Sequence, residues 1–159
     1  MSKKLQLTPD ISYVLGLYAC GSRTDIGVET NSIDLLARFA RIAIEELDAD
    51  PKKLLVEEHS KRTKAFFFNS KLKKLFDKAL DRRENLFKYK NDYSANYFAG
   101  IYDCKGGKDA KGLYLKDLDT RDDIMLEKLG FRTKVAGSKK YLISEKAFID
   151  FIKKFSARI

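Results

Sequence analysis

The sequence is poor in the residues that build metal sites and flexible linkers. It has one histidine, two cysteines and two prolines among 159 residues. Cys20 and Cys104 do not form a CxxC pair and His59 is the single histidine, so the residues do not support a structural zinc site. We expect both thiols to be free and buried. With so little proline and only nine glycines, the chain predicts one domain, or two small half-domains sharing a core.

Long hydrophobic runs and the common catalytic motifs are also missing. No apolar run approaches the roughly 20 residues of a membrane span, and the first residues lack the apolar core of a signal peptide. We therefore expect a cytoplasmic protein with no membrane partner. The sequence shows no Ser-His-Asp arrangement, phosphate-binding glycine loop or dinucleotide fingerprint. Gly106 and Gly107 follow a predicted helix rather than a strand, and we assign them to a turn.

The charge of the chain is mixed in sign and unevenly distributed. There are 32 basic and 23 acidic side chains, for a formal net charge of +9. Residues 52–90 hold thirteen Lys and Arg against five Asp and Glu, whereas residues 1–50 hold five against eight. Clustered basic side chains attract phosphates and release counterions on binding them. This pattern indicates either a polyanionic partner or a lysine-rich solvated surface of the thermophile kind.

An internal repeat organises the chain. Residues 13–22 align without gaps with residues 97–106, and Tyr, Gly, Tyr and Cys recur at the same four offsets. Thr8, Pro9 and Asp10 form a helix start before the first copy, and Ser94 is the predicted cap of the second. Both copies are therefore predicted to be helices that head equivalent units.

The segments after the two helices also correspond. Apolar spacing, caps and turn residues predict a strand, a helix, a hairpin and a final helix in each unit. The expected strands are 25–30, 53–58 and 62–68 in the first unit, and 111–117, 132–136 and 140–143 in the second. The prediction is an α+β protein of two pseudo-symmetric α-β-α-β-β-α repeats, covering residues 1–92 and 93–159.

Small residues recur on the two repeated helices. Gly16 and Cys20 lie four residues apart on one helix face, as do Gly100 and Cys104. A glycine inside a helix costs about 0.5–1 kcal/mol relative to alanine, so its presence in both copies suggests close backbone approach. We expect the two helices to cross at these residues. Cys20 and Cys104 would then be near neighbours and could bridge under oxidation, provided that their Cα atoms come within about 7 Å. The alternative is that each glycine packs against its own sheet.

Residues 14–22 and 98–106 resemble the motif of the LAGLIDADG homing endonucleases, and the chain is similar to the double-motif members of that superfamily. The resemblance implies that the paired helices form the interface between the repeats. It also implies that the flanking sheets form a saddle for a nucleic-acid duplex, in a monomer with an internal pseudo-two-fold axis. The predicted order differs from the family's, because one strand follows each motif where two are expected.

In active members of that family, an acid at the foot of each motif helix binds divalent metal ions. The corresponding positions here are Gly21 and Lys105, which offer no carboxylate. Asp103 lies two residues earlier, roughly 200° round the helix, so it should face away from the helix contact unless the helix end unwinds. Asp25 could approach from a loop. We therefore expect no catalytic residue, metal ligand or cofactor. Mg²⁺ would be required only by a nuclease with displaced ligands such as Asp103.

Basic side chains are the candidate nucleic-acid contacts, because alternation along strands places them on sheet faces that suit phosphates. The first strand should instead present Asp25 and Glu29, which repel a phosphate backbone. Ordinary solvated strand faces are the alternative. The candidates are Arg62, Lys64, Lys105, Lys116, Arg132, Lys134, Lys139 and Lys140.

These observations lead to one functional hypothesis and two alternatives. The hypothesis is a catalytically inactive LAGLIDADG-like protein that binds nucleic acid, with double-stranded DNA as the favoured partner. The first alternative is a metal-dependent DNA endonuclease with displaced ligands. The second is a protein-interaction or structural module on the same fold.

Overall fold

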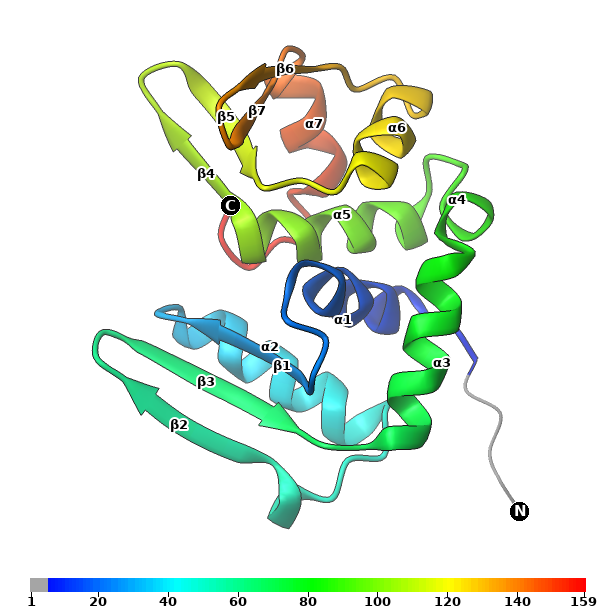
Figure 1. Cartoon of the computed structure of the whole chain (residues 1–159), viewed down its shortest axis with the longest axis vertical. Helices are drawn as coiled ribbons and strands as arrows, with labels where there is room; N and C mark the ends of the chain where they lie inside the picture. The colour runs from blue at the N-terminus through cyan, green and yellow to red at the C-terminus, as the bar shows by residue number, and fades with distance from the viewer. Residues whose placement is uncertain (1–5) are drawn as a thin grey trace.

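The structure, a computed structural model, describes residues 6–159 (Figure 1). This part of the chain forms seven α-helices, one short 3-10 helix and two antiparallel sheets. The first half consists of α1 (Pro9–Cys20), β1 (Ile26–Thr30), α2 (Ile33–Glu45), η1 (Pro51–Lys53), β2 (Leu55–His59), β3 (Arg62–Phe67), α3 (Ser70–Asp81) and α4 (Arg83–Leu86). The second consists of α5 (Asp92–Lys105), β4 (Gly106–Asp109), β5 (Gly112–Lys116), α6 (Thr120–Lys128), β6 (Thr133–Ala136), β7 (Lys139–Leu142) and α7 (Glu145–Ile152).

Helices α1 and α5 lie side by side at the centre of the molecule (Figure 1). Both are buried on nearly every face, as expected for a core helix with apolar or small residues all round. Thr8 caps α1, and its hydroxyl accepts the Ile11 N–H at 3.1 Å. The cap of α5 is Asn91 rather than the predicted Ser94, which completes a capping box from the N3 position. The helix-start signals therefore place both helices to within three residues.

The first-half sheet has the strand order β1-β3-β2. Ile26, Val28 and Thr30 of β1 are buried, so the side of β1 that faces the core is set by simple alternation. Helix α2 packs against this side of the sheet. The opposite face carries Glu29, which pairs in register with Lys64 of β3.

The second-half sheet has the order β4-β5-β7-β6, one strand more than predicted. The additional strand is β4, which includes the Gly106-Gly107 pair that the sequence analysis assigned to a turn. That prediction was wrong because the glycine is required for close packing within a strand and not for a turn. A Cβ atom on Gly107 would lie 2.4 Å from the Tyr114 hydroxyl oxygen, so the glycine makes room for a ring on the neighbouring strand. The second half thus runs α-β-β-α-β-β-α.

The two sheets lie on either side of the central helix pair, and both lie on the left of Figure 1. Helices α3 and α4 cover the right-hand side, and α7 and α6 lie to the right of the second sheet, above α5. Among residues 6–159, no helix is both long enough and apolar enough to cross a membrane.

Candidate nucleic-acid interface

The contact between α1 and α5 depends on two glycines. A Cβ atom on Gly16 would lie 2.1 Å from the Tyr97 carbonyl oxygen, and one on Gly100 would lie 2.2 Å from the Tyr13 carbonyl oxygen. Real side chains do not occupy such distances, so the two helix backbones touch at this point. The predicted crossing through Gly16 and Gly100 is the arrangement found, and it fixes where the carboxyl ends of both helices lie.

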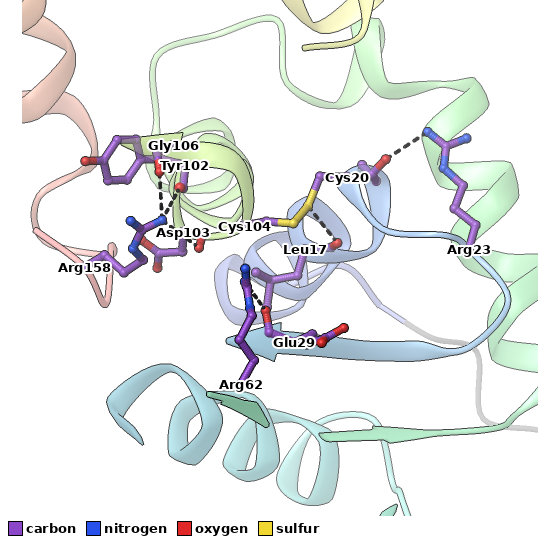
Figure 2. Close-up of a disulfide and its surroundings, with 11 residues drawn as sticks. Leu17, Cys20, Arg23, Glu29, Arg62, Tyr102, Asp103, Cys104, Gly106 and Arg158 are labelled. Carbon is purple, nitrogen blue, oxygen red and sulfur yellow. Dashed lines mark hydrogen bonds between the residues drawn. A yellow bond between two sulfur atoms is a disulfide. The ribbon is translucent and has the colours of Figure 1, made fainter. Parts of the chain in front are cut away.

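A disulfide joins those carboxyl ends. Cys20, the last residue of α1, is bonded to Cys104 near the end of α5, with a Cα–Cα distance of 6.6 Å (Figure 2). The expectation of two free thiols was therefore wrong. The expectation that the two cysteines are near neighbours once the helices cross is confirmed. Cysteine count and spacing did not decide between free and bonded thiols, because 84 residues separate the partners and only the helix crossing brings them within bonding distance.

A cleft of about 860 Å³ opens at these helix ends, between the two sheets. Its floor includes both cysteines together with Gly21 and Lys105, the positions that correspond to the metal-binding acids of the resembled family. Its two sides come from β1 and β3 in the first half and from β4 and β5 in the second. A cleft between the two sheets is the arrangement that the resemblance predicted, and its two sides differ in charge.

The second-half side is predominantly basic. Lys116 pairs in register with Lys139, and Lys134 pairs with Tyr141, so all of these side chains share one face of the sheet with Tyr114. Leu113 and Leu115 are buried on the opposite face. Arg132 precedes β6 and is exposed. Neither Lys116, Arg132 nor Lys134 makes an ion pair with another described residue, and Lys116 lines the cleft.

Two of the predicted contacts on this sheet are paired internally. Lys139 Nζ lies 3.0 Å from an Asp109 carboxylate oxygen, which also accepts the Tyr141 hydroxyl at 2.7 Å. Hydrogen bonds from Tyr141 and Lys139 lower the pKa of Asp109 to about 2. Lys140 is a correction to the prediction: it lies on the helix side of the sheet and pairs with Asp123 of α6 at 2.8 Å. Hairpin sequence alone could not assign the two adjacent lysines to opposite faces.

The first-half side is less basic. Lys64 Nζ lies 2.7 Å from an Asp25 carboxylate oxygen, and the Arg62 guanidinium donates to the Glu29 backbone carbonyl at 2.8 Å (Figure 2). The exposed Glu29 side chain has no cationic partner among the described residues. The cationic charge of Lys64 is therefore offset within the sheet, and the predicted asymmetry between the two sides is present in the geometry.

The residues at the helix ends do not fit a catalytic divalent metal. Gly21 has no side-chain ligand and Lys105 is a cation. Asp103 is buried, and its carboxylate already accepts hydrogen bonds from the Tyr13 and Ser156 hydroxyls and from the Ala157 N–H. Burial, together with Asp103, raises the pKa of Tyr13. Within residues 6–159, no group of three or more His, Cys, Asp or Glu side chains is placed to hold a metal ion.

Arg158 is a cleft residue that the sequence analysis missed. It follows the last helix and lines the cleft floor beside Lys105. It belongs to no motif, strand or periodic face, so no sequence signal could have found it. Asp103 was noticed, but as a residue facing away from the helix contact, whereas its carboxylate accepts the hydroxyl of Tyr13 from the partner helix.

Comparisons with known proteins place this fold. No protein-family model matches the chain, and no curated protein is similar to it in sequence. Among solved structures, variants of the homing endonuclease I-DmoI superpose with a TM-score of 0.69, covering 92% of this chain and 96% of that one at 18% identity. A complex of I-DmoI with DNA and Mn gives a TM-score of 0.68, covering 94% and 97% at 19% identity. The chain therefore has the fold of I-DmoI, a LAGLIDADG homing endonuclease, as the repeated motif predicted.

Proposed function

We propose that this protein binds double-stranded DNA in the cleft between its two sheets and does not cleave it. The observation that carries the proposal is the row of basic side chains on the outer face of the second-half sheet. Lys116 and Lys134 lie there without an acidic partner among residues 6–159, and Lys116 lines the open cleft between the sheets. The fold supports it as well, since solved structures of I-DmoI with this fold contain its target DNA.

The proposed contacts are electrostatic and unequal between the two halves. Basic side chains on a sheet face bind backbone phosphates and position a duplex without reading its sequence. The second half would supply most of them, because Lys64 is paired with Asp25 in the first. The contacts that we assign to the duplex are Arg62, Lys105, Lys116, Arg132 and Lys134. Lys139 is left out for the same reason as Lys64, because it is paired with Asp109.

We expect no cleavage because the side chains at the ends of α1 and α5 offer no free oxygen ligands to a metal ion. Hydrolysis of a phosphodiester by metal-activated water requires hard oxygen ligands. Gly21 and Lys105 supply none, and the Asp103 carboxylate is occupied by three donors. We therefore propose no catalytic residue and no metal cofactor for this protein, which would act as a monomer.

Binding and cleavage are tested on one labelled duplex. Fluorescence anisotropy should give an affinity that falls steeply between roughly 50 and 200 mM salt, with a log–log slope of about 0.9 per neutralised phosphate. An RNA duplex of the same sequence, used as competitor, tests the choice of DNA. Incubation with Mg²⁺ or Mn²⁺ should leave the strands intact on a denaturing gel.

Each alternative has its own outcome in these measurements. Metal-dependent nicking that is lost in Asp103→Asn would show an endonuclease with displaced ligands and overturn the proposal. No binding even at low salt, or binding insensitive to salt, would favour an interaction module on the same fold.

A further inference from the structure

The last residues of the chain are anchored to the end of α5. The Ala157 N–H donates to an Asp103 carboxylate oxygen at 2.7 Å, and the Ser156 hydroxyl donates to the other oxygen. Asp103 is buried within α5. A buried carboxylate that accepts several hydrogen bonds holds its donors firmly, because leaving any of them unpaired is costly. The position of the next residue, Arg158, is therefore fixed relative to the helix.

The guanidinium of Arg158 is itself held by three main-chain carbonyls. Its Nη1 donates to the oxygens of Tyr102, Asp103 and Gly106 at 3.3, 3.2 and 2.9 Å (Figure 2). These carbonyls belong to the carboxyl end of α5, where the helix dipole favours a cation. The guanidinium carbon also lies 5.7 Å from the centroid of the Tyr102 ring. An arginine positioned in this way loses little further side-chain freedom when it binds a ligand.

The edge of the Arg158 guanidinium that carries Nε and Nη2 is not used by these carbonyls. Nε and Nη2 of Arg158 make no hydrogen bond to a described residue, and the residue is exposed and lines the cleft. Lys105 and Lys116 line the same cleft. Lys105 precedes Gly106, whose carbonyl accepts from Arg158, and Gly106 pairs in register with Leu115, the neighbour of Lys116. None of the three forms an ion pair with another residue in the described part of the chain. Three cations without an ion-pair partner among the described residues therefore line this cleft. Of the acids that line it, Asp103 is committed to its own donors and Asp25 to Lys64, and Glu29 lies on the first-half side.

We propose that Arg158, Lys105 and Lys116 form a phosphate site on the floor of the cleft. Its ligand is a backbone phosphate of a nucleic-acid strand, held by the free edge of the Arg158 guanidinium and by the two ammonium groups. The inference rests on the proposed function for the identity of that strand. It adds that the C-terminal tail is part of the binding surface, and that the cleft floor holds an anion.

Substitution of Arg158 by glutamine is the direct test. Arg158→Gln removes the charge while keeping amide donors for the carbonyls, and Lys154→Gln removes an exposed charge that does not line the cleft. At low salt, Arg158→Gln should weaken duplex binding about tenfold and reduce the magnitude of the salt slope by about one. Lys154→Gln should change neither quantity. Equal affinities and slopes for the two variants would overturn the site.

A second measurement on the unmodified protein keeps the test independent of folding and of the duplex. Inorganic pyrophosphate is titrated while the Arg158 Nε–H resonance is followed by NMR, with the Arg121 Nε–H as control, since that group is held by Glu84. The Arg158 resonance should shift and saturate, and the Arg121 resonance should stay in place. A shift without any duplex binding would keep the phosphate site and reject the proposed function. No shift would overturn the site even if the duplex binds elsewhere on the cleft.

Discussion

Gly16 and Gly100 bring two helix backbones into direct contact at the centre of the molecule. The Cα atom of Gly100 lies 3.2 Å from where a Cβ of Gly16 would stand, and the relation holds in reverse. The same contact carries the ends of both helices to the cleft floor, where Gly21 and Lys105 lie. Packing at the helix contact thereby sets the geometry of the candidate binding site.

Substitution of Gly100 by alanine should destabilise the protein. The new methyl group would meet the Tyr13 carbonyl oxygen, a backbone atom that cannot move aside alone. Overpacking of this kind costs about 1–3 kcal/mol, and sometimes more. Urea denaturation measures the loss. Gly21→Ala is the matched control, because its methyl would meet ordinary contacts at 3.6 Å and beyond, and it should change stability by less than about 0.5 kcal/mol. Equal effects of the two substitutions would contradict the close contact.

Reduction of the Cys20–Cys104 disulfide should lower stability by about 2–4 kcal/mol, because the bond closes a long loop and restricts the unfolded chain. Mass spectrometry after alkylation should find no modified cysteine in the native protein and two after reduction. Urea denaturation with and without reductant gives the size of the effect. The Cys20→Ala/Cys104→Ala protein serves as control, since its stability should not respond to reductant. Rapid alkylation of both thiols before reduction would contradict the bond.

Substitution of Arg132 and Lys134 together by alanine should flatten the salt dependence of duplex binding by roughly two units. Neither side chain has an acidic partner within residues 6–159, so the full charge of each is available to phosphates. Lys140→Ala is the control, since Lys140 is paired with Asp123 on the other face of the sheet. Anisotropy titrations at several salt concentrations compare the slopes. A slope change as large for Lys140→Ala would argue against a directed binding face.

Neutralising Asp25 should strengthen duplex binding. Asp25→Asn releases the ion pair to Lys64 and removes a negative charge from the cleft, so a further cation becomes available to the duplex. The same titrations should show a higher affinity and a steeper slope than for the unmodified protein. Unchanged binding would mean that the first-half side contributes little, and weaker binding would mean that Lys64 depends on Asp25 for its position.

The Glu84–Arg121 pair predicts part of the acid response of stability. Arg121 Nε donates to a Glu84 carboxylate oxygen at 2.5 Å, and hydrogen bonding to Arg121 lowers the pKa of Glu84 from its ordinary 4.5 to about 2. A carboxyl with a depressed folded-state pKa contributes stability above its unfolded pKa and loses it as the pH falls through the folded value. Glu84→Gln should therefore flatten the decline in stability between about pH 4.5 and 2. Urea midpoints across that range would show it, and an unchanged slope would contradict it.

The sequence predicted the two motif helices well because the signals for them are local. Thr8 and Pro9 mark the start of α1 by the chemistry of neighbouring residues. Gly16 recurs as Gly100 at the same place in the repeated segment, and this recurrence predicted the helix contact. Alternation along β1 likewise gave its buried face. Local signals failed where a residue had two uses. Gly106 and Gly107 suit a turn, but they form part of β4, where Gly107 leaves room for the ring of Tyr114 on β5.

The sequence by itself determined the α+β class, the two motif helices and the buried side of β1, because these depend on spacing along the chain. It did not determine the strand order of the second half or the face on which Lys140 lies. The tertiary structure alone decided which charges remain available. Lys64 and Lys140 are paired with acids 39 and 17 residues away, and Arg158 reaches the cleft through Asp103, more than fifty residues earlier. The physical reason is that ion pairs, disulfides and hydrogen bonds act over a few ångströms in space. The number of residues between two side chains does not tell which of them come within this distance in the folded protein.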